Sequence, residues 1–170
     1  TGGRRDLSFD IELPRPLAQP EAFYALLEFD ARLVDVASAC FEQCVSEGWV
    51  TDGVLSQSET QAQNLWQLRE GISESIAAYT PYKNDLSVRV SRMPAFLDDI
   101  DALVGEQYPD FEICWYGHIG DGNLHLNILK PEGLSQAEFY ERCHHISPEI
   151  FARVAALNGS ISAEHGVGLL

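Results

Sequence analysis

The stretch GHIGDGNLHLN, residues 117–127, places two histidines, three glycines and an Asp-Gly pair within eleven positions. The glycines disfavour a helix, because each costs about 1 kcal/mol relative to alanine in a helix interior. Asp-Gly is a preferred central pair of a two-residue type I′ hairpin. We therefore predict that Asp121 and Gly122 form a tight turn, which pairs His118 directly with His125 on the opposite strand.

The predicted hairpin separates polar from apolar side chains over residues 111–129, since successive residues of a strand point to opposite faces. Directly opposed residues have Cβ atoms about 4.5–5.5 Å apart, which lets two imidazoles share one metal ion. A hairpin whose histidines simply face solvent is the alternative interpretation, because a metal site needs a third ligand. The polar face would carry Tyr116, His118, His125 and Asn127, and the apolar face Trp115, Ile119, Leu124, Leu126 and Ile128.

Four other stretches carry apolar residues at the spacing of amphipathic helices, with capping residues or glycines at their ends. They are 33–45, ended by Gly48; a long helix opened by the capping box Ser56 and Glu59; a helix with Pro94 in its first turn; and a helix from the capping box Ser135 and Glu138 to Asn158-Gly159, which Pro148 should kink or split.

Strands are predicted over 22–29, 50–56 and 83–90, in addition to the two arms of the hairpin. The stretch 83–90, KNDLSVRV, alternates polar residues with apolar ones, as a half-buried strand does. Strands with one polar face favour an antiparallel sheet over a parallel one. We therefore expect an α+β fold with a mainly antiparallel sheet, helices on one face, and the other face open for a ligand.

Composition restricts the class of protein. At 170 residues with 45% apolar content, the chain has the length of one compact domain. A net charge of -15 argues against nucleic acid and anionic membranes as partners.

The apolar runs are far shorter than the roughly 20 residues of a membrane span, and no leader is recognisable, so we expect a soluble, cytoplasmic protein. Residues 1–20 are expected to be a loop-rich lead-in or a remnant added for expression.

A second polar motif, SAEHGVG at residues 162–168, offers a third metal ligand. Adjacent residues of an extended chain point to opposite sides, so one of Glu164 and His165 could join the metal while the other faces a substrate. Two imidazoles and a carboxylate form a catalytic set with open positions, which suits Zn²⁺ first and Mn²⁺ or Fe²⁺ as well. A polar loop is the alternative. The adjacent His144 and His145 are expected to have no ligand role.

Cationic residues are few, so their positions are informative. Arg69 and Ser73 lie one helical turn apart on one face, and Lys83 begins the polar face of its predicted strand. An anionic substrate would suit Arg for bidentate carboxylate recognition and Lys as a second charge. For Arg69 or Lys83 taken alone, a solvated surface charge is the favoured interpretation. The four cysteines fit no zinc or disulfide pattern and are expected to be ordinary buried thiols.

The combination of GHIGDGNLHLN and SAEHGVG, with LWQLREGISES and YKNDLSV, resembles the C-terminal substrate domain of FAD-linked oxidases acting on 2-hydroxy acids. The similarity runs from about Phe23 to the last residue, which makes 21–170 part of that domain. The family includes D-lactate dehydrogenases, glycolate oxidase subunits and D-2-hydroxyglutarate dehydrogenases, and the last branch is the most similar in appearance.

The resemblance implies specific roles, carried over position by position. His118, His125 and Glu164 would hold the divalent metal, His165 would be the catalytic base, and Arg69, Ser73, Lys83 and Asn127 would bind the substrate. It also implies a ferredoxin-like fold and an FAD bound mainly by a separate N-terminal domain that this chain lacks, so the chain alone is expected to be inactive.

Two other functions remain open at this point. A metal-dependent hydrolase could use the same three ligands to activate water. A non-catalytic cap or dimerisation module, as a homodimer, is the second alternative. The identity of the 2-hydroxy acid and of the electron acceptor does not follow from the sequence.

Overall fold

The computed structural model describes residues 16–17 and 19–163. The chain divides into two compact units, of which one ends at Ser75 and the other begins at Ile76. None of the described helices is long and apolar enough to cross a membrane.

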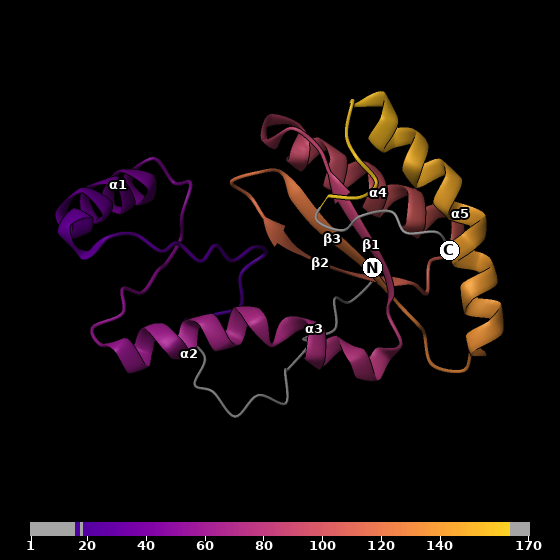
Figure 1. Cartoon of the computed structure of the whole chain (residues 1–170), viewed down its shortest axis with the longest axis horizontal. Helices are drawn as coiled ribbons and strands as arrows, with labels where there is room; N and C mark the ends of the chain where they lie inside the picture. Colours follow the sequence, from indigo (N-terminus) through magenta and orange to yellow (C-terminus); the bar gives the residue numbers. More distant parts are fainter. Residues whose placement is uncertain (1–15, 18, 164–170) are drawn as a thin grey trace. The chain divides into compact units, whose positions relative to one another are not determined.

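The first unit contains the predicted helices but not the predicted strands. Its helices are α1 (Val34–Ser46), α2 (Glu59–Glu70) and α3 (Ile72–Ser75), preceded by a 3-10 turn at Ala31–Leu33 (Figure 1). Neither 22–29 nor 50–56 forms a strand. The apolar residues there suggested burial, yet Phe23 is 71% exposed, and none of the described residues before Ile76 is buried.

The helix α2 begins two residues later than the capping-box pattern predicted. Ser58, not Ser56, is the N-cap, and its hydroxyl accepts a hydrogen bond from the Gln61 backbone N–H at 3.2 Å. Ser58 has the extended backbone that an N-cap residue requires. Gln61 also accepts from the Gln57 N–H through its side chain, which ties the chain before the helix to the first turn.

The second unit is built on three antiparallel strands, β1 (Tyr82–Ser87), β2 (Glu112–His118) and β3 (Asn123–Leu129), in the order β1-β3-β2. Strand β1 is shorter than the predicted 83–90, because a 3-10 turn at Val90–Arg92 leads into α4 (Met93–Gln107). Pro94 lies in the first turn of α4, as predicted. A further 3-10 turn, Ile76–Tyr79, precedes β1.

Helices α4 and α5 (Gln136–Ala156) cover one face of this sheet (Figure 1). Their apolar stripes pack on the strand residues that point to the same side. This confirms the α+β class with helices on one face of an antiparallel sheet. The fully buried side chains include Phe96, Ile100 and Val104 of α4, Phe139, Ile146 and Ile150 of α5, and Leu86, Leu126 and Ile128 of the strands.

The finer prediction, a ferredoxin-like arrangement, stays a prediction. The described elements of this unit run β-α-β-β-α, whereas that motif adds one more strand after the second helix. An isolated antiparallel bridge joins Ser87 of β1 to Ser160, beyond the end of α5.

Helix α5 is continuous through Pro148, so the predicted split is wrong. Buried residues on both sides of the proline, Ile146 and Ile150, hold the two halves on one core. The predicted capping box is confirmed: the Ser135 hydroxyl accepts from the Glu138 N–H, and the Glu138 carboxylate accepts from the Ser135 N–H, each at 3.3 Å. The helix ends before Asn158, which has a φ of 53°.

Candidate functional site

The face of the sheet opposite α4 and α5 is polar, and all three strands contribute to it. In the register between β1 and β3, Lys83 is opposite Asn127 and Asp85 is opposite His125. In the register between β3 and β2, Tyr116 is opposite His125. Because residues opposite one another share a face, these side chains lie on one surface, as predicted for Tyr116, His125 and Asn127.

The predicted register of the hairpin is wrong by two residues. His118 pairs with Asn123 rather than with His125, and four residues, 119–122, form the loop instead of the Asp-Gly pair alone. The Gly122 N–H donates to the His118 carbonyl at 3.1 Å, and the Asp121 carboxylate accepts from the Asn123 N–H at 3.0 Å. A shift of two residues keeps every side chain on its predicted face.

Gly122 explains why the longer loop forms. Its φ is +81°, a conformation that side-chain-bearing residues rarely adopt. Its carbonyl accepts a hydrogen bond from the Val88 N–H at 3.1 Å, and a Cβ at this position would meet the Val88 carbonyl oxygen. The loop is therefore tied to the chain just after β1, a tertiary contact that the Asp-Gly signal does not contain.

The two histidines are diagonal neighbours on the polar face. The ring centroids of His118 and His125 are 5.9 Å apart. His125 also lies 4.8 Å from the Tyr116 ring, centroid to centroid, and its Nδ1 is 3.1 Å from the Asp85 carboxylate. With zinc–nitrogen bonds of about 2.0–2.1 Å, two imidazoles sharing an ion have centroids about 5–6 Å apart. The spacing thus suits a shared ion.

Two asparagines of β3 present unsatisfied polar atoms on this face. Asn127 is 1% exposed, and its amide N–H groups donate to the carbonyls of Cys114 and His125 at 3.2 and 3.1 Å. These two acceptors fix the amide orientation, so Oδ1 is the atom without a partner among the described residues. Asn123 is 3% exposed, and neither polar atom of its side chain has a partner there.

Within the described ranges, no group of three or more His, Cys, Asp and Glu side chains converges as a metal site. The third predicted ligand, Glu164, and the predicted base, His165, lie outside those ranges. The described residues therefore supply two imidazoles of the predicted donor set and, within those ranges, no third ligand.

The predicted anion-binding residues lie on three elements. Arg69 is in the last turn of α2 and Ser73 is in α3, where both are partly buried. Lys83 is exposed on β1 in the second unit, opposite Asn127. Arg69 and Lys83 lie on a helix and a strand, as predicted, whereas Ser73 lies in α3 and not in the same helix as Arg69.

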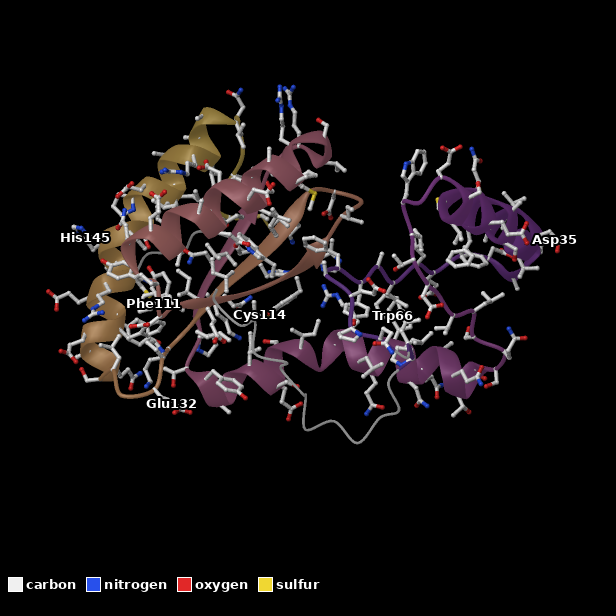
Figure 2. All side chains as sticks on the ribbon, turned by 180° about the vertical axis from the view of Figure 1, so that it is seen from behind. Asp35, Trp66, Phe111, Cys114, Glu132 and His145 are labelled. Atoms are coloured by element: carbon white, nitrogen blue, oxygen red, sulfur yellow. The ribbon has the colours of Figure 1, made fainter. Side chains whose placement is uncertain are left out.

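The remaining histidines, His144 and His145, lie on α5. The His144 ring packs edge-on against Tyr82 at 5.6 Å, and His145 lies on the outer side of α5, away from the sheet (Figure 2).

The cysteines are free thiols in different environments. Cys143 is fully buried and Cys40 is exposed, so the expectation of buried thiols holds only in part. Burial raises the pKa of Cys114, which lies on β2 (Figure 2), and raises the pKa of Cys143 to about 12. Neither thiol therefore ionises near neutral pH.

Two residues of the polar face were not assigned a role from the sequence. The alternation in KNDLSVRV places Asp85 on the polar face, but its contact with His125 depends on which strands are neighbours. Asn123, which the predicted register pairs with Gly120, was likewise given no role. Burial without a hydrogen-bond partner, which singles out Asn123, has no signature in the sequence.

Comparison with known proteins identifies the family. Residues 5–170 match the family model described as FAD linked oxidases, C-terminal domain. The chain therefore belongs to this family of C-terminal domains, in agreement with the resemblance carried by the two Gly-His motifs.

The most informative relatives are dehydrogenases of one kind. The chain is 59% identical over 161 residues to the D-2-hydroxyglutarate dehydrogenase of Stutzerimonas stutzeri, covering 93% of this chain and 35% of the relative. It is 52% identical over 158 residues to that of Xanthomonas citri pv. viticola, covering 91% and 34%. The mitochondrial enzyme of Arabidopsis thaliana is 35% identical over 161 residues, covering 91% and 27%. The chain thus spans about a third of the length of these relatives.

Proposed function

We propose that this chain is the substrate- and metal-binding part of an FAD-dependent dehydrogenase that oxidises a D-2-hydroxy acid to the 2-oxo acid. D-2-hydroxyglutarate is the first candidate, because relatives more than 50% identical carry that name; D-lactate and glycolate are the others. The observation that carries the proposal is the polar sheet face, where two imidazoles share the surface with buried amide atoms that have no hydrogen-bond partner among the described residues. Buried polar atoms without partners are costly, so a ligand that satisfies them is favoured.

Substrate binding would use the cationic residues and the amides. Arg69 offers a planar guanidinium for bidentate contact with a carboxylate, and Lys83 offers a second positive charge. Ser73 would add a hydroxyl donor. Asn127 would present to the substrate its Oδ1, the side-chain atom without a partner among the described residues.

His118, His125 and Glu164 would hold the divalent ion. Zn²⁺ is the preferred ion for two imidazoles and a carboxylate, and Mn²⁺ and Fe²⁺ are alternatives. When bound, the ion supplies Lewis acidity, which lowers the pKa of a coordinated hydroxyl.

His165 would act as the base that takes the proton from the substrate hydroxyl. An imidazole with an unperturbed pKa of about 6.5 is suited to this transfer near neutral pH. When bound, the flavin supplies the acceptor for the hydride. The described strand-to-helix junctions contain no glycine-rich dinucleotide fingerprint, so we assign no flavin-binding residue to this chain. We also propose that the protein is located in the cytoplasm and forms a homodimer.

The test is a substrate panel on the full-length protein that contains this chain, with an artificial electron acceptor and elemental analysis of the metal. We expect oxidation of D-2-hydroxy acids that bleaches the flavin, with a stoichiometric divalent ion. Ester hydrolysis without flavin reduction would instead indicate the metal-dependent hydrolase.

A pair of adjacent substitutions separates the base from the ligand. His165→Ala should reduce turnover while the metal content stays near that of the parent, whereas Glu164→Ala should lower the metal content first. Equal metal loss in both variants would contradict the role of His165.

A further inference from the structure

The side chain of Asn123, the first residue of β3, is buried without a hydrogen-bond partner. It is 3% exposed, and neither Oδ1 nor Nδ2 has a partner among the described residues. A buried amide that makes no hydrogen bond destabilises the folded state. The hydrogen bonds of the described residues therefore give no reason for an amide at this position.

Asn123 lies on the polar face beside both imidazoles. It is directly opposite His118 on β2, and it precedes His125 by two residues on β3. Directly opposed residues have Cβ atoms about 4.5–5.5 Å apart, and residues two apart on one strand are separated by about 7 Å on the same face. One small molecule bound at the imidazoles therefore comes within reach of the Asn123 amide.

The burial of Asn123 is not that of a core residue. Its strand partner His118 and the loop residues 119–121 are exposed, and the Asp121 carboxylate accepts a hydrogen bond from the Asn123 backbone N–H at 3.0 Å. Asn123 thus lies on the polar side of the sheet, next to exposed residues, and not between the sheet and helices α4 and α5. A ligand bound on the polar face would lie next to the amide.

We propose that the Asn123 amide binds the carboxylate and the hydroxyl of the 2-hydroxy acid, an inference that rests on the proposed function. An amide offers N–H donors and a carbonyl acceptor. An ionised carboxylate only accepts hydrogen bonds, whereas an alcohol hydroxyl can donate one. A 2-hydroxy acid carries these two groups on adjacent carbon atoms, so one small molecule satisfies both atoms that the fold leaves without partners.

Asn127 cannot take the same role. Its N–H groups already donate to the carbonyls of Cys114 and His125, which leaves the acceptor Oδ1 without a partner among the described residues. An acceptor does not bind an ionised carboxylate, which requires a donor. Of the two asparagines, Asn123 is therefore the one suited to the charged end of the acid.

The first experiment separates binding from flavin reduction in the full-length protein that contains this chain. The oxidised protein is mixed anaerobically with the best substrate among D-2-hydroxyglutarate, D-lactate and glycolate. The concentration dependence gives Kd, and saturation gives the limiting rate of flavin reduction. Asn123→Ala should raise Kd about 10–100-fold, because a hydrogen bond to a charged group is lost, and should change the limiting rate less.

Two outcomes of this experiment are distinct. An unchanged Kd in Asn123→Ala, with flavin reduction in the parent, would overturn the inference and leave the proposed function standing. A parent whose flavin none of the three acids reduces would overturn the proposed function and, with it, this inference.

Two further variants test the amide itself. Asn123→Asp keeps the shape and the acceptor but loses the donors and adds a negative charge, so its Kd should rise at least as much as that of Asn123→Ala. An aspartate variant that binds like the parent would overturn donation to the carboxylate. Asn84→Ala is the matched control, because Asn84 Nδ2 is also buried without a partner, but the residue is opposite the core residue Leu126 and so faces the helices. Its Kd should equal that of the parent, and an equal rise in Kd would overturn the assignment.

The melting temperature and the flavin content distinguish binding from a structural role. Both should stay level in Asn123→Ala, or the melting temperature should rise, because no side-chain hydrogen bond among the described residues is lost. A fall in either quantity that accounts for the higher Kd would show that Asn123 supports the fold or the flavin instead, and would overturn the inference.

Discussion

His118 and His125 lie diagonally across the β2–β3 hairpin with ring centroids 5.9 Å apart, because His118 pairs with Asn123 and His125 pairs with Tyr116. The diagonal arrangement keeps both imidazoles on the polar face while leaving them in different surroundings. His118 is exposed at the end of β2, and His125 is partly buried in the centre of the sheet.

The first prediction concerns zinc affinity. His118→Asn and His125→Asn should each weaken Zn²⁺ binding by more than the roughly 10–100-fold expected for loss of a residue that only supports a ligand. The double variant should bind little more weakly than either single one, because one remaining imidazole and a carboxylate make a poor site. Isothermal titration in a chelating buffer measures all three. His145→Asn, on the outer side of α5, should bind like the parent. Full affinity in either single variant would contradict the shared ion.

The second prediction concerns the hairpin loop. Gly122→Ala should lower the free energy of unfolding by at least about 1–2 kcal/mol, the cost of a left-handed conformation for a residue with a side chain. Contact of the new Cβ with the Val88 carbonyl adds to that cost. Gly120→Ala is the matched control in the same loop, because a Cβ there meets nothing within 4 Å. Urea denaturation measures the difference, and equal stability of the two variants would refute this account of the loop.

The elements that could be predicted from the sequence are those whose signals are local. Helix α5 with its capping box, Pro94 at the start of α4 and the half-polar strand β1 follow from side-chain periodicity and capping chemistry. The sharing of one face by His125 and Asn127 follows as well, since alternation along a strand does not depend on the loop.

The features that the sequence could not supply depend on tertiary contacts. Loop length at the hairpin depends on the hydrogen bond from Val88 to Gly122. The absence of strands at 22–29 and 50–56 reflects the lack of a partner strand in the described first unit, although their apolar content is that of buried strands. The pairing of Asp85 with His125 requires the strand order β1-β3-β2.

The third prediction concerns thiol reactivity. Cys143 is fully buried in α5, and burial raises its pKa to about 12, so the reactive thiolate is scarce at neutral pH. A chromogenic disulfide reagent at about pH 8 should modify the exposed Cys40 rapidly and Cys143 only after denaturant is added. Peptide mass mapping identifies the modified residues. Modification of Cys143 at the rate of Cys40 in the native protein would contradict its burial.

The same pKa shift predicts a pH dependence of stability. The folded thiol ionises at a higher pH than the unfolded thiol, whose pKa is about 8.5. Its contribution to stability is therefore complete below about pH 8.5 and is lost as pH rises toward 12. Between about pH 8.5 and 12, the free energy of unfolding of the parent should fall more steeply with pH than that of Cys143→Ala. Denaturant titrations at several pH values measure both slopes. Equal slopes would show that this thiol ionises alike in both states.

The last prediction separates stability from ligand binding at the two buried asparagines. Asn127→Ala should lower the free energy of unfolding by about 1–3 kcal/mol, because it removes two hydrogen bonds to partly buried strand carbonyls. Asn123→Ala should cost much less or stabilise the fold, since its side chain makes no hydrogen bond within the described residues and its burial is unfavourable.

Binding should respond differently from stability. If the unsatisfied amide of Asn123 serves the ligand of the polar face, Asn123→Ala in the full-length protein should raise KM for the 2-hydroxy acid while the melting temperature stays level or rises. A residue retained only for packing would lower the melting temperature and leave KM unchanged. Measuring KM and the melting temperature together distinguishes these outcomes. A buried polar group that lowers the stability of the folded state is expected where function requires it.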